Sequence, residues 1–589
     1  MTAESEDSDA IPPEALEEIR GAVRMGITFT SQNIFEEKLT LQQVLGLVSP
    51  LDRDGAISLC AEWNRWNTWV LFHNGTWKPA QKDLEKLLDA VVPPNAQRRA
   101  LAVFDDEDFF SPLSEISVLA LIGLLCRYAT VSGGESTETR YSQRALFRAL
   151  LALQGSIFPD NFLDLPIAEQ FPFAIRVTLA NITNQNSWSY DMGRLHALLT
   201  VPEIADCLDG MSVREWFLRR LNVNGDDYEC VANTFLGSAI YKADYSTLPQ
   251  QAPALYQRMA PLLRLSTTSS EAVAHGFNKT GLQGEPRHLS DAVPHSNVLL
   301  VRPMIRLGEK LICTSPRNLF NKLHRGLPYL CLEARTNPGE EKTRPRDEFG
   351  YIFERYVIWL MKQWVAGAEV RLATNYWISQ PGGPAERDIL IIQGETGYVF
   401  EVKATVPPMK IRQFGSLEDL VALHQKAGQQ AYSAAEALVS GNAFEDKKLR
   451  SPLPKLKHVV PCAITYEFLA IRWPYSDSFE KALQESVGKP LFSGQHATLP
   501  LQILDIQQVE VWDDLFSLPT EIGRLFEALE RRALNPSKRY RNLAEDPRNS
   551  FRSDYAENPG IVRKMVDAAE QAGSRRLKAI SAEDADFRK

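Results

Sequence analysis

Three charged side chains in one short segment have the types and the spacing that metal-assisted hydrolysis requires. The segment AERDILIIQGETGYVFEVKAT (385–405) indicates two apolar strands joined by a GETG turn, with Asp388 in the first strand and Glu401 and Lys403 in the second. If the two glycines of the turn pair with each other, Asp388 faces Lys403 directly. Because side chains alternate along a strand, Asp388, Glu401 and Lys403 then share one face, with the two carboxylates roughly 7–8 Å apart at the backbone.

Two carboxylates and an ammonium group on one face favour divalent-metal chemistry on a phosphate ester. Hard oxygen ligands suit Mg²⁺ or Mn²⁺, and such a metal acidifies a bound water and neutralises charge in the transition state. The Lys403 ammonium could orient that water or hold a phosphate oxygen. The alternative is a cross-strand salt bridge between Asp388 and Lys403, worth about 0–1 kcal/mol on a solvated sheet face. A salt bridge alone does not explain why Glu401 interrupts an apolar run.

The elements that would position these groups surround the segment. Apolar side chains recur at helical spacing over 346–365, a second helix is indicated at 417–439, and strands are indicated near 368–373, 387–393, 398–404 and 458–466. This order of helix, three strands, helix and strand predicts a compact α/β unit with a mixed sheet.

These residues resemble the motif of the PD-(D/E)XK nuclease superfamily, which has the restriction-endonuclease-like fold. That family carries an acidic residue on one strand and Glu-x-Lys on the next, and Asp388 with Glu401-x-Lys403 matches this pattern. Arg387 stands where the name of the motif expects proline, a departure that the family tolerates widely. The resemblance covers roughly residues 345–470 and implies divalent-metal dependence, phosphodiester hydrolysis and a nucleic-acid substrate.

The same resemblance implies a role for each residue of the site. Asp388 and Glu401, helped by the carbonyl of Val402, would bind Mg²⁺ or Mn²⁺. Lys403 would position the attacking water. Glu354, on the helix before the strands, would support the metal or its water shell, as a further glutamate does in many family members.

Polar residues that follow the Glu-x-Lys strand complete the set of candidates. Gln425 and Gln429 lie four residues apart on one face of the second helix and match a polar residue that many family members carry there. Lys410 and Arg412 could hold the phosphate backbone, although a solvated loop explains both cations equally well.

The rest of the chain divides by its patterning into further regions, so the expected architecture is multidomain α+β. We expect a mostly helical N-terminal region of unknown role at 1–290, a lead-in hairpin and helix at 291–344, the nuclease core at 345–475, a helical extension at 476–535 and a helical, polar and partly disordered tail at 536–589. Within the first of these, the polar stretch 266–297 indicates a linker or long loop.

The composition excludes several classes of protein. The 589 residues carry a net charge of −9 and are 44% hydrophobic, which excludes a disordered chain and a coiled-coil rod. Seven scattered cysteines without a C-x-x-C motif argue against a disulfide framework and a cysteine-rich zinc site, and they suit a reducing cytosol. The most apolar stretch, 116–126, has about 11 residues where a membrane span needs about 20. We therefore expect a soluble, cytoplasmic protein without a membrane partner.

A metal-dependent DNA nuclease is the function that these observations favour, with RNA left open as a substrate. A large unassigned region fused to such a nuclease resembles bacterial defence or restriction systems, antiviral ones included. In those systems a sensor or a partner protein restrains the cutting domain. The alternative is a catalytically inactive nuclease fold that binds nucleic acid or a partner protein as a scaffold.

Overall fold

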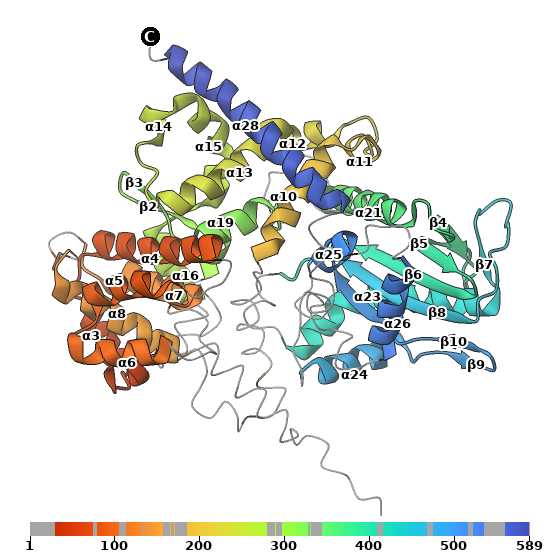
Figure 1. Cartoon of the computed structure of the whole chain (residues 1–589), viewed down its shortest axis with the longest axis horizontal. Coiled ribbons are helices and arrows are strands. Elements are labelled where there is room, and N and C mark those ends of the chain that lie inside the picture. Colours follow the sequence, from red (N-terminus) through yellow and green to blue (C-terminus); the bar gives the residue numbers. More distant parts are fainter. Residues whose placement is uncertain are drawn as a thin grey trace, which may run out of the picture.

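A computed structural model shows a helical region and a sheet-containing domain that lie side by side (Figure 1). The structure describes residues 30–587 except for 75–78, 105–112, 132–133, 137, 157–164, 166–169, 171–184, 280–288, 290–296, 328–329, 331–343, 409–410, 412–415, 468–474, 516–521 and 535–559. Within these ranges no helix combines the length and the apolar character that crossing a bilayer requires.

The region before residue 290 is built almost entirely of helices, as its patterning predicts. They are α2 (Ser31–Phe35), α3 (Leu41–Val48), α4 (Arg53–Asn74), α5 (Gln81–Val91), α6 (Pro94–Phe104), α7 (Glu115–Tyr128), α8 (Arg140–Gly155), α10 (Gln185–Thr200), α11 (Pro202–Ala205), α12 (Val213–Leu221), α13 (Gly225–Tyr241), α14 (Leu248–Gln251), α15 (Pro253–Ser266) and α16 (Ser270–Lys279). Thr40 and Ser212 begin α3 and α12 with capping boxes, in which side chains bind the free N–H groups of the first turn. The apolar stretch 116–126 lies in α7, which is buried along most of its length.

A small three-stranded sheet connects this region to the rest of the chain. It contains β1 (Thr267–Ser269), β2 (Met304–Leu307) and β3 (Lys310–Cys313), flanked by α18 (Asn297–Val301) and α19 (Pro316–Leu323). The β2–β3 hairpin turns at Gly308, as expected. The prediction of a long loop at 266–297 is wrong for β1 and α16, because β1 pairs in parallel with the distant β2 and α16 buries Val273 in the core of the helical region.

The sheet-containing domain has the predicted order of helix, three strands, helix and strand. Its elements are α21 (Arg344–Val365), β4 (Arg371–Ile378), β5 (Ala385–Gln393), β6 (Thr396–Lys403), α23 (Leu417–Ser440), β7 (Ala443–Phe444) and β8 (His458–Thr465). The strands β4, β5 and β6 are antiparallel neighbours, and β8 pairs in parallel with β6. Apolar side chains alternate between two cores, so that Ile389 and Phe400 pack with α21 while Leu390 and Val399 pack with α23.

The segment 476–535 differs from the expected helical extension, because part of it continues the sheet. It contains α24 (Tyr475–Val487), β9 (Phe492–Ser493), β10 (His496–Thr498), β11 (Gln502–Asp505), α25 (Ile506–Leu515) and α26 (Ile522–Leu534). Both β10 and β11 pair in parallel with β8, which gives an eight-stranded mixed sheet. Short strands of two to four residues carry little sequence signal, since their pairing with β8 creates them.

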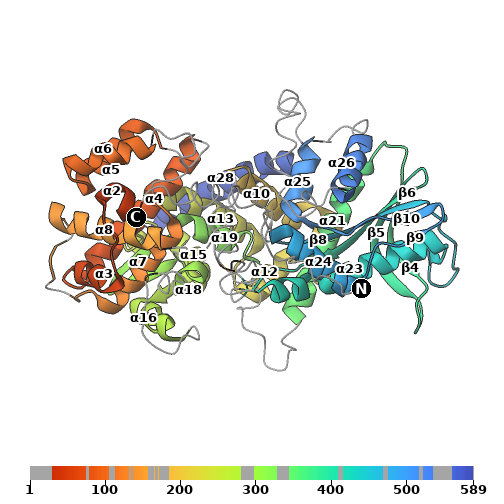
Figure 2. The same cartoon turned by 90° about the horizontal axis from the view of Figure 1, so that it is seen from below.

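The tail at 536–589 contains one long helix over the part that the structure describes, in agreement with its expected helical character. Helix α28 (Ile561–Phe587) packs along α10, α13 and α15 of the helical region, and Figure 2 shows it beside α10. A Cβ atom at Gly193 of α10 would collide with the carbonyl oxygen of Val562, so glycine permits this close approach. Arg576 also pairs with Asp227 at 2.6 Å. Buried contacts and ion pairs therefore hold a segment that is polar overall.

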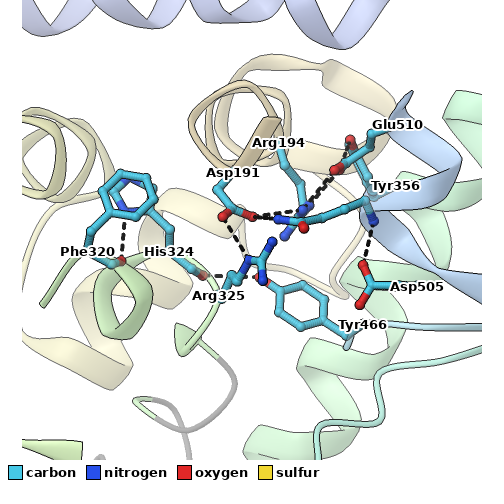
Figure 3. Close-up of polar contacts among 10 residues, drawn as sticks. Asp191, Arg194, Phe320, His324, Arg325, Tyr356, Tyr466, Asp505 and Glu510 are labelled. Atoms are coloured by element: carbon cyan, nitrogen blue, oxygen red, sulfur yellow. Dashed lines mark hydrogen bonds and ion pairs between the residues drawn. The ribbon is translucent and has the colours of Figure 1, made fainter. Parts of the chain in front are cut away.

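A buried network of charges joins the helical region to α21 and α25 (Figure 3). Arg194 of α10 donates two hydrogen bonds to Glu510 of α25, at 2.6 and 2.8 Å, and lies 3.0 Å from Asp191. Asp191 also pairs with Arg325 at 3.0 Å. The hydroxyl of Tyr356 on α21 donates to Glu510 at 2.7 Å. Segments more than 300 positions apart are thus fixed to one another without solvent.

The same network reaches the end of strand β6. The guanidinium of Arg194 lies over the ring of Tyr466, 5.1 Å from its centroid. The backbone N–H of Tyr466 donates to the carbonyl of Lys403 at 3.2 Å. Since Tyr356 is two residues from Glu354 on α21, the network positions both the helix and the strand that carry candidate site residues.

Candidate active site

The β5–β6 hairpin brings Asp388 opposite Glu401 rather than opposite Lys403. The opposed pairs end with Ile389 and Phe400, and the next position along this register places Asp388 against Glu401. The predicted pairing of the two turn glycines is wrong, because Gln393 pairs with Thr396 and the two-residue turn therefore lies at 394–395, one residue earlier than expected. Its first residue, Gly394, has a φ of 58°, which glycine adopts easily in a two-residue turn.

Asp388, Glu401 and Lys403 nevertheless come together at the end of these strands. Oδ2 of Asp388 accepts the backbone N–H of Val402 at 2.7 Å and lies 3.5 Å from Nζ of Lys403. The same Nζ lies 3.6 Å from Oε2 of Glu401. The three side chains differ in exposure, at 16% for Asp388, 29% for Lys403 and 1% for Glu401. The ammonium group of Lys403 therefore contacts one partly exposed carboxylate, that of Asp388, and one fully buried carboxylate, that of Glu401.

Glu401 is the most unusual member of the site. Neither of its carboxylate oxygens has a hydrogen-bond partner among the described residues. Burial, and then the negative charge of Asp388, raise the pKa of Glu401 to about 8. The nearest cations, Lys403 and Arg387, lie 3.6 Å from its oxygens, beyond hydrogen-bond distance, so each oxygen can still accept a closer ligand such as a metal ion.

Arg387 belongs to this site, although its sequence position drew attention only as a departure from a motif. Its Nε lies 3.6 Å from Oε1 of Glu401, and its side chain also donates to Oγ of Ser433 on α23 at 2.7 Å. Tyr376 on β4 is fully buried, and burial followed by the charge of Glu401 raises its pKa well above the usual value. An arginine in an otherwise apolar strand, directly before Asp388, was the signal that could have identified it.

Glu354 lies on the helix α21, as expected, and interacts electrostatically with the strand residues. Burial is the largest cause that raises its pKa, to about 7, and the charge of Asp388 is the second. The cations Arg355 and Lys403 oppose this shift. A Cβ atom at Gly350, one turn earlier, would meet no other atom within 4 Å, so the helix surface beside Glu354 is open.

The remaining predicted residues lie in different surroundings. Gln425 and Gln429 both donate to the carbonyl of Ser486 in α24, at 3.3 and 3.2 Å, so their side-chain amides connect two helices. Lys410 and Arg412 lie outside the described residues.

The acidic donor set of the site is a pair, not a triad. Within the ranges that the structure describes, no three or more His, Cys, Asp or Glu side chains are grouped so that they could hold a metal ion. Among the described residues, Asp388 and Glu401 are the carboxylates that pair with Lys403 within 4 Å. Proteins commonly bind Mg²⁺ through one or two carboxylates together with waters and substrate phosphate, so the residues present fit such a metal.

No family model, curated protein or solved structure matches this chain. The chemistry of the site must therefore be inferred from its own residues. They comprise two carboxylates, of which one is buried without hydrogen-bond partners, two cations within 3.6 Å of Glu401, and a third carboxyl group on α21 whose pKa is about 7.

Proposed function

We propose that the sheet-containing domain is a divalent-metal-dependent nuclease of the PD-(D/E)XK type, which hydrolyses phosphodiester bonds. The observation that carries this proposal is the Glu401 carboxylate, which lies next to Asp388 and Lys403. This carboxylate is 1% exposed and has no hydrogen-bond partner among the described residues. Such a group is unfavourable in the absence of a ligand, and a divalent cation between Asp388 and Glu401 would compensate it. The order of α21, three antiparallel strands, α23 and the parallel β8 agrees with the fold that the resemblance implies.

Each protein residue has a distinct task in this proposal. A bound Mg²⁺ or Mn²⁺ would supply an acidified water and neutralise phosphate charge. Asp388 and Glu401 would hold that ion, and the Val402 N–H keeps the Asp388 carboxylate in place at 2.7 Å. Lys403 would orient the attacking water or a phosphate oxygen. Glu354, with a pKa of about 7, can accept and return a proton near neutral pH.

Arg387 would act by holding the Glu401 carboxylate in place. At 3.6 Å its guanidinium offsets part of the negative charge of Glu401 before a metal arrives, and its hydrogen bond to Ser433 at 2.7 Å anchors it to α23. This anchoring would limit how far the Glu401 carboxylate can move when a metal ion binds to it. Arg387 is thus a positioning residue and not a metal ligand.

DNA is the substrate that we propose, since most of the family that the motif resembles cuts DNA, and RNA is the alternative substrate. We further propose that the chain is the effector of a bacterial defence system, in which the helical region, alone or with a partner protein, restrains the nuclease domain. The buried network around Arg194 supports this arrangement, because it connects α10 of the helical region to α21, which carries Glu354.

Plasmid nicking tests the proposal directly. The full-length chain should nick supercoiled DNA with Mg²⁺ or Mn²⁺ and not with EDTA, and Asp388→Asn, Glu401→Gln and Lys403→Ala should each lower the rate by about 100-fold or more. Lys457→Ala is the matched control, because Lys457 directly precedes the neighbouring strand β8 and pairs on the surface with Glu395 at 2.7 Å. Equal rates in Lys403→Ala and wild type would contradict the proposal.

One observation favours a second function, that of a binding module without catalysis. Arg387 and Lys403 each lie 3.6 Å from Glu401, so the carboxylate already has cationic neighbours. In that case the chain would bind nucleic acid but would not nick it with any divalent metal, and addition of partner proteins encoded nearby would not change this result. Nicking that appears only with such a partner would instead support a nuclease under control.

A further inference from the structure

A short, rigid hairpin projects from the edge of the sheet next to the candidate site. Residues 443–453, called here the 443–453 hairpin, leave β7 and return through a bridge between Phe444 and Pro452. The carboxylate of Asp446 accepts the backbone N–H groups of Lys448 at 2.8 Å and Leu449 at 2.7 Å, and the backbone of Arg450 donates to the Asp446 carbonyl at 2.9 Å. These bonds hold the tip in one conformation.

The tip presents cations to solvent. Lys447, Lys448 and Arg450 are all exposed. Nζ of Lys447 lies 4.8 Å from the ring centroid of Trp377, and the guanidinium of Arg450 lies 5.8 Å from that of Phe444. Aromatic faces attract cations, so two of the three charges are held near fixed positions without being neutralised by carboxylates. Leu449 between them is 81% exposed, an apolar side chain at the outermost point of the hairpin.

The acidic residues of the hairpin do not neutralise this tip. Glu445 pairs with Arg371 of β4. Asp446 is engaged by two backbone N–H groups, which lower its pKa. The tip therefore carries three cations against one carboxylate that is turned toward its own backbone, in a chain whose net charge is −9. A polyanion that approaches the sheet domain of this acidic chain finds a locally positive surface at the hairpin.

The sheet places this surface close to Asp388. Trp377 and Ile378 of β4 pair with β7 on one side and with Glu386 and Ala385 on the other, directly before Asp388. Because β7 is two strands from β5 and strands lie about 4.8 Å apart, the base of the hairpin lies about 10 Å across the sheet from the strand of Asp388, and the cationic tip extends beyond this base. Phosphates along one strand of duplex DNA are separated by roughly 3.4 Å of helix rise, so the base of the hairpin is about three nucleotides away and the tip is further.

We propose that the 443–453 hairpin holds the phosphodiester backbone of the nucleic-acid substrate a few nucleotides from the bond that is cut. This inference rests on the proposed nuclease function and extends it, because it identifies where the substrate leaves the site. The rigid tip lowers the entropic cost of binding, since its backbone is ordered before the nucleic acid arrives. Contacts of this kind position the substrate and are independent of base sequence.

Salt-dependent binding measures this contact separately from cleavage. Fluorescence anisotropy of a labelled 30-base-pair duplex with the full-length chain in EDTA gives the affinity between 50 and 200 mM NaCl. The test variant combines Lys447→Gln, Lys448→Gln and Arg450→Asn; asparagine is chosen because Arg450 has a φ of 49°, a left-handed conformation that asparagine tolerates. The control combines Lys426→Gln, Lys481→Gln and Lys489→Gln, three exposed cations of the same domain on and after α23 and α24.

The expected result is a smaller salt dependence in the test variant alone. If all three cations contact phosphates, the slope of log K against log salt concentration should fall in magnitude by about 2.7, so wild type should lose roughly 40-fold more affinity than the variant over this salt range. If the test variant binds the duplex with the same affinity and the same salt dependence as wild type and the control, the inference is overturned. The cations of the hairpin would then face a different acidic partner, such as a protein surface. Wild type that fails to bind the duplex would overturn the proposed nuclease function together with it. Equal melting temperatures for all three chains exclude misfolding as the cause.

Discussion

Breaking the buried ion pair between Arg194 and Glu510 should destabilise the junction of the two parts of the molecule more than any surface substitution. Both side chains are almost fully buried, at 2% and 0% exposure, and two hydrogen bonds of 2.6 and 2.8 Å join them. Among the described residues, Arg194→Met leaves the buried Glu510 carboxylate with Tyr356 as its remaining side-chain donor. Within the same part of the chain, Glu510→Met leaves Arg194 with Asp191 as its remaining charged partner, at 3.0 Å.

The magnitude follows from the charge that each substitution leaves behind. Removing one partner of a buried ion pair costs about 3–5 kcal/mol, because the other charge stays without compensation. The double variant Arg194→Met/Glu510→Met removes both charges and should cost less than either single variant. The coupling free energy, which is the sum of the two single losses minus the loss in the double variant, should therefore exceed the cost of one single variant, about 3–5 kcal/mol.

Urea unfolding of the full-length chain, followed by tryptophan fluorescence, provides the assay, because Trp364 and Trp512 lie close together near the junction. The midpoint of the first transition should fall for both single variants and partly recover in the double variant. Arg214→Met is the control, since Arg214 and Asp226 form a pair that is 43% and 56% exposed and is worth about 0–1 kcal/mol. Single variants within about 1 kcal/mol of wild type, or additive losses in the double variant, would refute the argument.

Three further predictions concern other parts of the fold. Glu401→Gln should stabilise the chain in EDTA at pH 9 by about 1–3 kcal/mol, because at that pH, above the raised pKa of Glu401, a neutral amide replaces a buried carboxylate that lacks hydrogen bonds; a lower melting temperature than wild type at pH 9 would contradict the account of this carboxylate. Gly193→Ala should loosen the last helix, because its Cβ collides with a carbonyl of α28, and limited proteolysis should then release that helix, whereas Gly573→Ala, which meets nothing within 4 Å, should leave the digestion pattern unchanged. Burial lowers the pKa of His324 to about 4 and of His424 to about 3, so the unfolded chain binds protons below pH 6.5 that the folded chain does not. The contribution of these histidines to the free energy of unfolding should thus be fully present above pH 6.5. It should fall by about 1.4 kcal/mol per pH unit for each histidine down to about pH 4. His424→Gln should reduce that slope, and a slope equal to that of wild type would show that this histidine is not the cause.

The sequence predicted the order of elements around the site because that signal is local. Helix α21 shows regular apolar spacing, and β5 and β6 are apolar runs on either side of a glycine turn. The register was off by two positions, since two-residue turns at 394–395 and at 395–396 both fit the sequence GETG, and a turn that moves by one residue shifts every cross-strand partner by two. A shift of two keeps side-chain alternation along each strand, and Lys403 therefore still contacts both Asp388 and Glu401.

Features that depend on distant contacts were beyond the reach of local patterns. Arg194 and Glu510 are separated by 316 positions, and neither stands out among the other charges of the chain. Helix α28 buries only a few small and aliphatic side chains along a mostly polar sequence, so its composition resembles that of a disordered tail. The contact of Arg387 with Glu401 also required coordinates, because the motif directs attention to the residues that match it.

The position of a bound divalent cation tests the central claim most directly. Crystals of the full-length chain soaked in Mn²⁺ should show one anomalous scattering peak between the carboxylates of Asp388 and Glu401, and crystals of Glu401→Gln should show none at that place. A peak elsewhere in the molecule, or an unoccupied site with the guanidinium of Arg387 still against Glu401 at saturating Mn²⁺, would contradict it.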